Sequence, residues 1–466
     1  NAVCSIRQNR LCRNRKRDRK PFLRAAFHAT KTRQLSGIHL MSDSPFIPHE
    51  YAPLVGLLRC AVTGKPPDDD LTTIDWSTVL RQARKHSVDA FLYPWLALHA
   101  PALFSSQATA PTNSAPVAWR SLYLESAARA VQRQRQLAII FSALEGAGID
   151  VLPLKGAWLG AFVYDDPAQR RMTDLDLLVR TGDRDACHAQ FLSLGYSVQQ
   201  DVRQSPFAYS QTYVSRGHPY PVELHWKFDA ELIPDTPIPD GGAIWANAGR
   251  TDFLGHTIYR MSGEDQLVHL VHHILHHQFA LPLRAYLDLA LLVRKQEEGV
   301  SQSALDEAVK RWKVGRATPF VLGLVSELFG LPPRLDAPRE TTLFASALQS
   351  LFTLPEARDC VAETTLLQFR QASALQRLKL ILSRVLMPRS FLVQYYPCAR
   401  HLYGLPIAWC LRTVTLVRRN RTRMWDMRNP ASTTSAALGN SAARIALVRA
   451  LLRTEPSEAG GSGKQR

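Results

Sequence analysis

Two aspartates stand two positions apart in the short apolar segment TDLDLLV, although strands seldom carry acids. Because successive side chains of a strand point to opposite faces, Asp174 and Asp176 would share one face. The later segment PVELHWKF likewise places Glu223 and His225 on one face and its apolar residues on the other. If the two strands are neighbours with their apolar faces toward the core, three carboxylates converge on the exposed face.

Three carboxylates this close together would repel one another unless a cation lay between them. Mg²⁺ is the natural occupant, because it prefers oxygen ligands and completes its shell with water and substrate phosphates. A plainer alternative is that the two aspartates are strand residues paired with Arg170 and Arg171. Glu223 would then be an ordinary solvated strand residue. The scarcity of paired acids on strands favours the metal hypothesis.

Around these acids the chain alternates between short apolar runs and short helical patterns, which predicts a compact α/β unit over residues 149–228. We expect about five strands and two helices in this unit. The expected strands are 149–154, 173–179, 196–202, 207–215 and 220–228, and the expected helices are 155–164 and 182–195.

The whole chain predicts an α+β protein, in which a small mixed β-sheet core is flanked by N- and C-terminal helical regions. We place the α/β core at residues 149–260, a helical region before it at 41–148 and a helical region after it at 261–430. We expect residues 1–40 to be a disordered basic segment and residues 431–466 to be a mostly disordered tail.

The formal net charge of +17 is concentrated at the start of the chain. Residues 1–40 hold eleven Lys and Arg against one acid, whereas the rest of the chain carries 46 against 39. The stretch MSDSPFIPHEYAPL, which starts at Met41, reads like a natural beginning, so we expect the segment before it to lack a function. The alternative is a basic nucleic-acid or targeting tail, and with it a basic RNA-binding protein.

The seven cysteines are scattered and include no Cys-x-x-Cys pair. This pattern is evidence against a disulfide framework or a zinc knuckle, and it fits a reducing compartment. No run of eighteen apolar residues occurs, so we expect no stable membrane insertion. The sequence therefore predicts a cytoplasmic protein.

The order and spacing of these motifs carry a resemblance to a known family. The stretch LPLKGAWLGAFVYDDPAQRRMTDLDLLV, with LGYSV and VELHWKF after it, closely resembles the uncharacterised nucleotidyltransferase family of the DNA polymerase beta-like nucleotidyltransferase superfamily. In that superfamily a glycine motif precedes an Asp-x-Asp on the next strand and a third carboxylate on a later one. The matching positions here are Lys155-Gly156, Asp174 with Asp176, and Glu223, and the resemblance covers most of residues 70–295.

The resemblance implies transfer of a nucleoside monophosphate from a nucleoside triphosphate such as ATP to an unknown acceptor, with release of pyrophosphate. The acceptor could be a protein, a small molecule or an RNA end. The resemblance also implies two Mg²⁺ (or Mn²⁺) ions with Asp174 and Asp176 as their principal ligands. Glu223 would complete the acceptor-side metal site and help to deprotonate the acceptor hydroxyl.

The same resemblance implies that the glycine turn contacts the nucleotide. Gly156 would let the chain approach the phosphates at a helix N-terminus. The usual Gly-Ser or Gly-Gly of the superfamily is Gly156-Ala157 here, so phosphate contacts would come from backbone amides, Lys155 or an arginine. The candidate nucleotide-binding residues are Lys155, Gly156, Arg170, Arg171 and His225, of which His225 is interpreted as a packing or orienting group rather than a base.

Two alternatives stay open at this point. The chain could be a catalytically inactive member of the same fold that binds nucleotide or a partner, although a pure binder has no need to gather three carboxylates. The histidine run HLVHHILHH also has two interpretations. His269, His273 and His276 share a helix face at a spacing that metal sites use, but packing beside the active site is the favoured interpretation.

Overall fold

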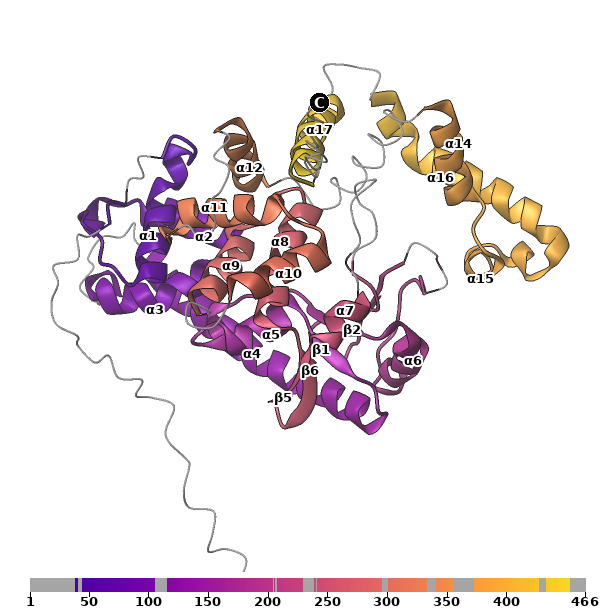
Figure 1. Cartoon of the computed structure of the whole chain (residues 1–466), viewed down its shortest axis with the longest axis horizontal. Helices are drawn as coiled ribbons and strands as arrows, with labels where there is room; N and C mark the ends of the chain where they lie inside the picture. Colours follow the sequence, from indigo (N-terminus) through magenta and orange to yellow (C-terminus); the bar gives the residue numbers. More distant parts are fainter. Residues whose placement is uncertain are drawn as a thin grey trace, which may run out of the picture. The chain divides into compact units, whose positions relative to one another are not determined.

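The computed structural model of the chain describes most of the sequence after the first 37 residues. The described residues are 38–40, 44–104, 115–203, 205, 208–228, 239, 241–295, 301–332, 341–354, 373–426 and 433–452. They form a mostly helical α+β fold with a small mixed sheet and a separate hairpin, which confirms the predicted fold class (Figure 1). The expectation that residues 1–40 are disordered falls outside the described residues, except for Ile38–Leu40.

The sheet has four strands in the order β1–β2–β4–β3. The strands are β1 (Val151–Pro153), β2 (Leu175–Val179), β3 (Ser210–Tyr213) and β4 (Val222–His225). β2 runs antiparallel to β1 and parallel to β4, and β3 runs antiparallel to β4. All five residues of β2 are buried, so this strand is covered on both faces.

One of the five expected strands does not form. The segment 196–202 makes only an isolated bridge between Ser197 and Val214. After this bridge, the side chain of Gln211 accepts a hydrogen bond from the backbone N–H of Val202 and replaces strand pairing there. The two expected helices do form, as α5 (Lys155–Phe162) and α6 (Arg184–Ser193).

Helices precede the sheet, as the sequence predicted. They are α1 (Ala52–Thr63), α2 (Trp76–Lys85), α3 (Asp89–His99) and α4 (Ala115–Gly146). α2 begins after Asp75, whose carboxylate accepts hydrogen bonds from the backbone N–H groups of Ser77 and Thr78. α4 ends before Gly148, whose φ of +68° is the left-handed conformation that favours glycine at a helix end.

The core also contains elements that the sequence did not indicate. A short helix, α7 (Gly241–Ala246), leads into a hairpin of β5 (Gly249–Phe253) and β6 (His256–Arg260). β6 contacts both β1 and α4, and α5 contacts β2. The hairpin therefore packs against α4 and against β1, the strand that follows α4 in the chain.

The chain after the hairpin is helical. The helices are α8 (Gly263–His276), α9 (Leu283–Lys295), α10 (Gln302–Trp312), α11 (Ala317–Phe329), α12 (Thr341–Thr353), α14 (Ala374–Val385), α15 (Arg389–Leu392), α16 (Leu405–Asp426) and α17 (Thr433–Leu452). α17 lies in the tail that was expected to be mostly disordered, which corrects that expectation. Its buried apolar side chains, among them Ile445 and Val448, join the main core, and α17 contacts α12 and α11. The proposed domain boundaries stay predictions.

No helix in the described part of the chain is long and apolar enough to cross a membrane. The first described residues are part of the fold. Ile38 exchanges backbone hydrogen bonds with the segment at Pro66 and Asp68, and Leu40 is buried against Gly56 of α1.

His86, at the end of α2, is a fully buried histidine that supports the helical part of the core. Its Nδ1 accepts a hydrogen bond from the backbone N–H of Leu283 at 3.2 Å, and its ring packs edge-on against Tyr51. Burial, with a smaller effect from the Lys85 charge, lowers the pKa of His86 to about 3. The folded protein therefore keeps this imidazole neutral at a pH where the unfolded chain protonates it.

We expect acid to destabilise the fold through His86. Because the pKa is lower in the folded state, the free energy of unfolding falls as the pH drops from about 6.5 toward 3, and at pH 5 the loss is about 2 kcal/mol. His86→Asn, which keeps an acceptor but cannot titrate, should reduce the difference in unfolding free energy between pH 7.5 and pH 5 by about that amount. Denaturant unfolding at the two pH values measures it. The exposed His99→Asn is the control, and an unchanged difference in the His86 variant would contradict the prediction.

Candidate active site on strands β2 and β4

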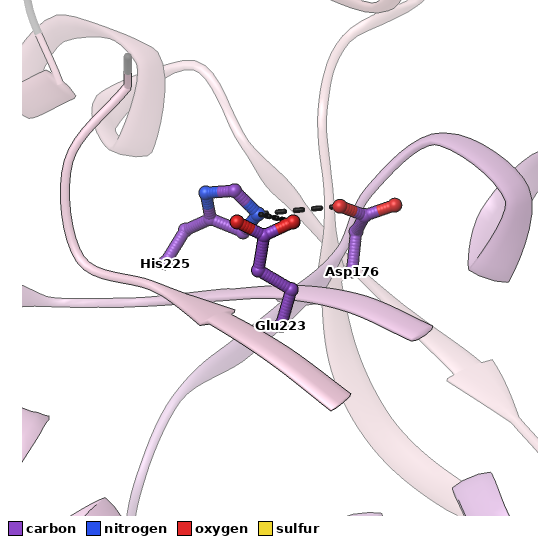
Figure 2. Close-up of side chains that lie close together, drawn as sticks. All are labelled: Asp176, Glu223 and His225. Atoms are coloured by element: carbon purple, nitrogen blue, oxygen red, sulfur yellow. Dashed lines mark hydrogen bonds and ion pairs between the residues drawn. The ribbon is translucent and has the colours of Figure 1, made fainter. Parts of the chain in front are cut away.

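The parallel pairing of β2 with β4 brings two acids directly opposite each other. The register pairs Asp176 with Glu223 and Leu177 with Leu224. Since side chains at paired positions point to the same face, the two carboxylates lie side by side, as Figure 2 shows. The convergence of Asp176 and Glu223 that the sequence predicted is thus present in the fold.

His225, which lies on β4 like Glu223, is the third member of this group. Its Nε2 lies 3.2 Å from Asp176 Oδ1 and 3.6 Å from Glu223 Oε2 (Figure 2). Ser210 of β3 donates a hydrogen bond from its hydroxyl to Glu223 Oε1 at 2.7 Å. One ligand atom from each of Asp176, Glu223 and His225 lies within 4.8 Å of the other two, and this is the only group of metal-ligating side chains found in the described residues.

Lys155 reaches the same group from the first residue of α5. Its Nζ lies 2.9 Å from Asp176 Oδ1. Its backbone has a φ of +42°, a left-handed conformation that costs energy for a residue with a side chain. This strained turn places a cation against the buried carboxylate.

The charges of the group shift the pKa values of its members. Burial would raise the pKa of Asp176, but the charges and hydrogen bonds of Lys155 and His225 outweigh it and hold that pKa well below its usual range. Burial would lower the pKa of His225, yet its bonds to Asp176 and Glu223 raise it to about 9. Without a bound cation, Lys155 and a protonated His225 therefore balance the two carboxylates.

The face that carries the acids is not exposed, contrary to the expectation from the sequence. The Asp176 side chain is only 8% exposed, whereas that of Glu223 is 28% exposed. α5 packs against β2, and its Lys155 lies on Asp176 at this face. A cavity of about 230 Å³, including space open to solvent, is lined by residues of α5 and α8. Its lining includes Lys155, Trp158, Gln266 and His269.

Asp174 lies outside the three-residue group. It precedes the first residue of β2 instead of pairing within the strand, and its side chain accepts a hydrogen bond from Thr173. Burial and the charge of Asp176 raise its pKa, while Lys155 lowers it. Asp174 therefore lies close enough to the group to interact with its charges, directly before the N-terminal end of β2.

Arg170 has a structural partner. Its guanidinium donates two hydrogen bonds to Asp288 of α9, from Nε at 2.8 Å and from Nη2 at 2.7 Å, and both side chains are buried. Tyr164 donates a third hydrogen bond to the same carboxylate. This geometry gives Arg170 a role in joining α9 to the glycine turn, and it does not support the predicted contact with phosphate.

Gly156 lies against that guanidinium. A Cβ added at Gly156 would lie 2.1 Å from Arg170 Nη1 and 2.9 Å from its Cζ. The missing side chain is therefore needed for packing on Arg170, which is a different reason from the predicted approach to phosphates. That approach stays a prediction.

We expect Gly156→Ala to lower the free energy of unfolding by about 1–3 kcal/mol, because the methyl group must displace a buried, ion-paired guanidinium. Gly160→Ala in the same helix is the matched control, since its Cβ would meet Arg170 side-chain carbons at an ordinary 3.8 Å. The control should be neutral or slightly stabilising, because alanine favours helices. Thermal and denaturant unfolding compare the two variants. Equal stability of both would show that the close approach at Gly156 does not matter.

Arg171 and Arg284 lie next to this turn. Arg171 forms an ion pair with the buried Asp89 of α3, with Nη1 3.4 Å from Oδ2, and lies 4.0 Å from Glu125. Arg284 donates from Nη1 to the backbone carbonyl of Arg171, while its buried Nε has no hydrogen-bond partner among the described residues. Burial and the nearby Arg170 lower the pKa of Arg284, and Asp174 is among the acids that act on it.

Of the histidine run at the end of α8, His269 packs in the core and the other four histidines are partly buried. His269 is buried and its ring contacts Phe228 and Trp312. In the described part of the chain, His269, His273 and His276 are not found as a group whose ligand atoms meet. Lys155 and His269 line the same cavity, so α8 lies beside the candidate site, as the packing interpretation expected.

The sequence comparisons bear on this arrangement. A family model described as uncharacterised nucleotidyltransferase matches residues 72–330. The chain belongs to this family. No curated protein and no solved structure matches the sequence. In this nucleotidyltransferase family member, the matched range includes Lys155, Asp174, Asp176, Glu223 and the helices α8 and α9.

Sequence reasoning missed one polar residue of the site. Ser210, which holds Glu223, lies on β3 and pairs in register with His225 of β4. Its signal was available, because Ser210 and Thr212 alternate with larger residues in the segment YSQTYV. Without the pairing of β3 with β4, however, nothing distinguished that hydroxyl from other strand serines.

Proposed function

We propose that this chain is a metal-dependent nucleotidyltransferase that moves a nucleoside monophosphate from a nucleoside triphosphate, with ATP as the first candidate, to an acceptor hydroxyl. The acceptor oxygen forms a bond to the α-phosphorus, the bond from that phosphorus to the pyrophosphate oxygen breaks, and pyrophosphate leaves. The acceptor proton passes toward Glu223 or to solvent. The acceptor belongs to a protein, a small metabolite or an RNA end.

The observation that carries the proposal is the in-register placement of Asp176 opposite Glu223 within the range matched by the family. Two carboxylates and an imidazole whose ligand atoms lie within 4.8 Å of one another fit a divalent cation such as Mg²⁺ or Mn²⁺. A cation bound there would stabilise the negative charge that develops on the phosphate. Asp174, which directly precedes β2, would contact the second of the two implied cations, the one bound to the nucleotide.

The basic residues of the turn have separate tasks in this proposal. Lys155 is held at Asp176 in the absence of substrate and would transfer its contact to a phosphate oxygen. Arg284 has a buried Nε without a partner among the described residues and contacts the carbonyl of Arg171, whereas Arg170 is bound to Asp288, so Arg284 is the better candidate for the triphosphate. Arg171, His225 and the backbone at Gly156 stay as further candidates near the nucleotide.

The experiment incubates the purified full-length chain with each labelled nucleoside triphosphate and Mg²⁺ or Mn²⁺. The expected result is pyrophosphate together with a labelled product. The double variant Asp174→Ala with Asp176→Ala is the control and should release none. Equal turnover by the double variant would refute the assignment.

A second candidate function rests on one specific observation. Lys155 and His225 both contact Asp176 and offset its charge, an arrangement that an inactive nucleotide- or partner-binding member of the family would also allow. Binding of a triphosphate without pyrophosphate release, under all metals tested, would favour this candidate. RNA binding by the basic segment depends on residues outside the described range.

We place the protein in a reducing compartment such as the cytoplasm. The described cysteines Cys60, Cys187, Cys398 and Cys410 are all free. Burial raises the pKa of the Cys60 and Cys187 thiols to about 12, so both behave as apolar core residues. Free cysteines are typical of such compartments.

A further inference from the structure

We propose that His225 is a direct ligand of the divalent cation, together with Asp176 and Glu223, and that this nitrogen makes the site select Mn²⁺ over Mg²⁺. This deepens the proposed function, because it replaces the expected all-carboxylate set by a mixed one. Asp174, which the sequence placed in the first set of ligands, then lies outside it.

The distances between the three side chains carry the assignment. His225 Nε2 lies 3.2 Å from Asp176 Oδ1 and 3.6 Å from Glu223 Oε2. Ligands about 2.1 Å from a shared ion are separated by about 3.0 Å at an octahedral edge and about 3.4 Å at a tetrahedral edge. The imidazole nitrogen is therefore already as close to both carboxylates as neighbouring ligands of one ion are.

The surrounding contacts hold these three atoms in place. Ser210 fixes Glu223 through Oε1, which leaves Oε2 on the side of His225. The ring of His225 stacks near Tyr209 at a centroid distance of 6.1 Å, and it is buried. Support of this kind is what orients ligands in metal sites, and here none of it involves Asp174.

The donor set determines the choice of ion. Mg²⁺ prefers an all-oxygen shell, whereas imidazole nitrogen suits first-row transition ions. Mn²⁺ serves in the same oxygen-rich sites as Mg²⁺. As a first-row transition ion it binds a nitrogen ligand more readily than Mg²⁺ does. A site with one buried imidazole and two carboxylates is therefore expected to bind Mn²⁺ more tightly.

The test measures Mn²⁺ binding to the full-length protein by electron paramagnetic resonance, with Mg²⁺ as competitor. We expect Mn²⁺ to bind at least roughly tenfold more tightly than Mg²⁺. Pulsed measurements on the wild-type protein should show coupling of the Mn²⁺ electron spin to an imidazole ¹⁴N. His225→Gln should lose that coupling and roughly tenfold or more of its Mn²⁺ affinity, while its Mg²⁺ affinity changes little.

His218→Gln is the matched control, because His218 stacks on Tyr196 outside the site. It should keep the coupling and the affinity. The wild-type nitrogen signal needs no variant, so the test holds even if His225→Gln folds poorly. Absence of Mn²⁺ binding, absence of nitrogen coupling or an unchanged His225→Gln each overturns the inference.

The outcome is separable from that of the proposed function. Nucleotidyl transfer without nitrogen coupling would leave the function in place and remove the histidine ligand. Nitrogen-coupled Mn²⁺ without transfer from any nucleoside triphosphate would support the ligand and count against the function.

Discussion

Asp176→Asn is expected to reduce nucleotidyl transfer by about 10³-fold, because a bound cation contributes several kcal/mol to the stabilisation of the transition state and each 1.4 kcal/mol is a factor of ten. Asp176 contacts both Lys155 and His225 through one oxygen, Oδ1. Asparagine keeps the shape and removes the charge. Initial rates of pyrophosphate release with the triphosphate that the wild-type protein prefers measure the effect.

The matched control is Asp185→Asn on α6, an exposed acid paired with Arg184 and Arg203 away from the site. The same substitution there should leave the rate unchanged. Circular dichroism and thermal unfolding of both variants separate a loss of chemistry from a loss of fold. A folded Asp176→Asn protein with wild-type rates would show that the group on β2 and β4 does not support transfer.

The convergence of the acids could be predicted from the sequence because it depends on a period of two within strands. Alternation alone placed Asp176 on one face of its strand and Glu223 with His225 on one face of theirs. That the two strands are neighbours was inferred from the family resemblance. The structure shows that they pair in parallel, with Asp176 opposite Glu223. The end of α4 could also be predicted from the sequence, because Gly148 is the kind of residue that favours the left-handed conformation after a helix.

The burial and the partners of the same residues could not be predicted, because they depend on elements far apart in the chain. α5 packs against β2 and places Lys155 on Asp176, an acid that a strand pattern alone left exposed. Asp174 falls one residue before β2, a boundary that alternation cannot fix to one position. Lys155 and His225 both contact Asp176, and no local pattern in the sequence links these three side chains.

Arg170 is the clearest case of a side chain whose partner lies far away in the sequence. Next to Asp174 and Asp176 it suggested either a phosphate ligand or a strand salt bridge. Its partner, Asp288, is 118 residues away, so no local pattern links the two. The same contact explains Gly156, whose absent side chain leaves room for the guanidinium.

We expect Asp288→Asn to lower the free energy of unfolding by about 3–5 kcal/mol, because it leaves the buried guanidinium of Arg170 without a counter-charge. Asp288 accepts two hydrogen bonds from Arg170 and one from Tyr164, and its side chain is only 3% exposed. Denaturant titration measures the change. Replacing both members, as in Arg170→Met with Asp288→Leu, should cost less than the sum of the two single changes.

Glu307→Gln provides the comparison, since it removes the carboxylate from the exposed pair with Lys310. That change should cost no more than about 0.5 kcal/mol, because solvent screens exposed pairs. If Asp288→Asn cost as little, Arg170 would be free of Asp288 and available to phosphate, as the sequence first suggested. A large cost confined to Asp288 instead assigns the arginine to the fold and leaves Lys155 and Arg284 as the cations nearest the nucleotide.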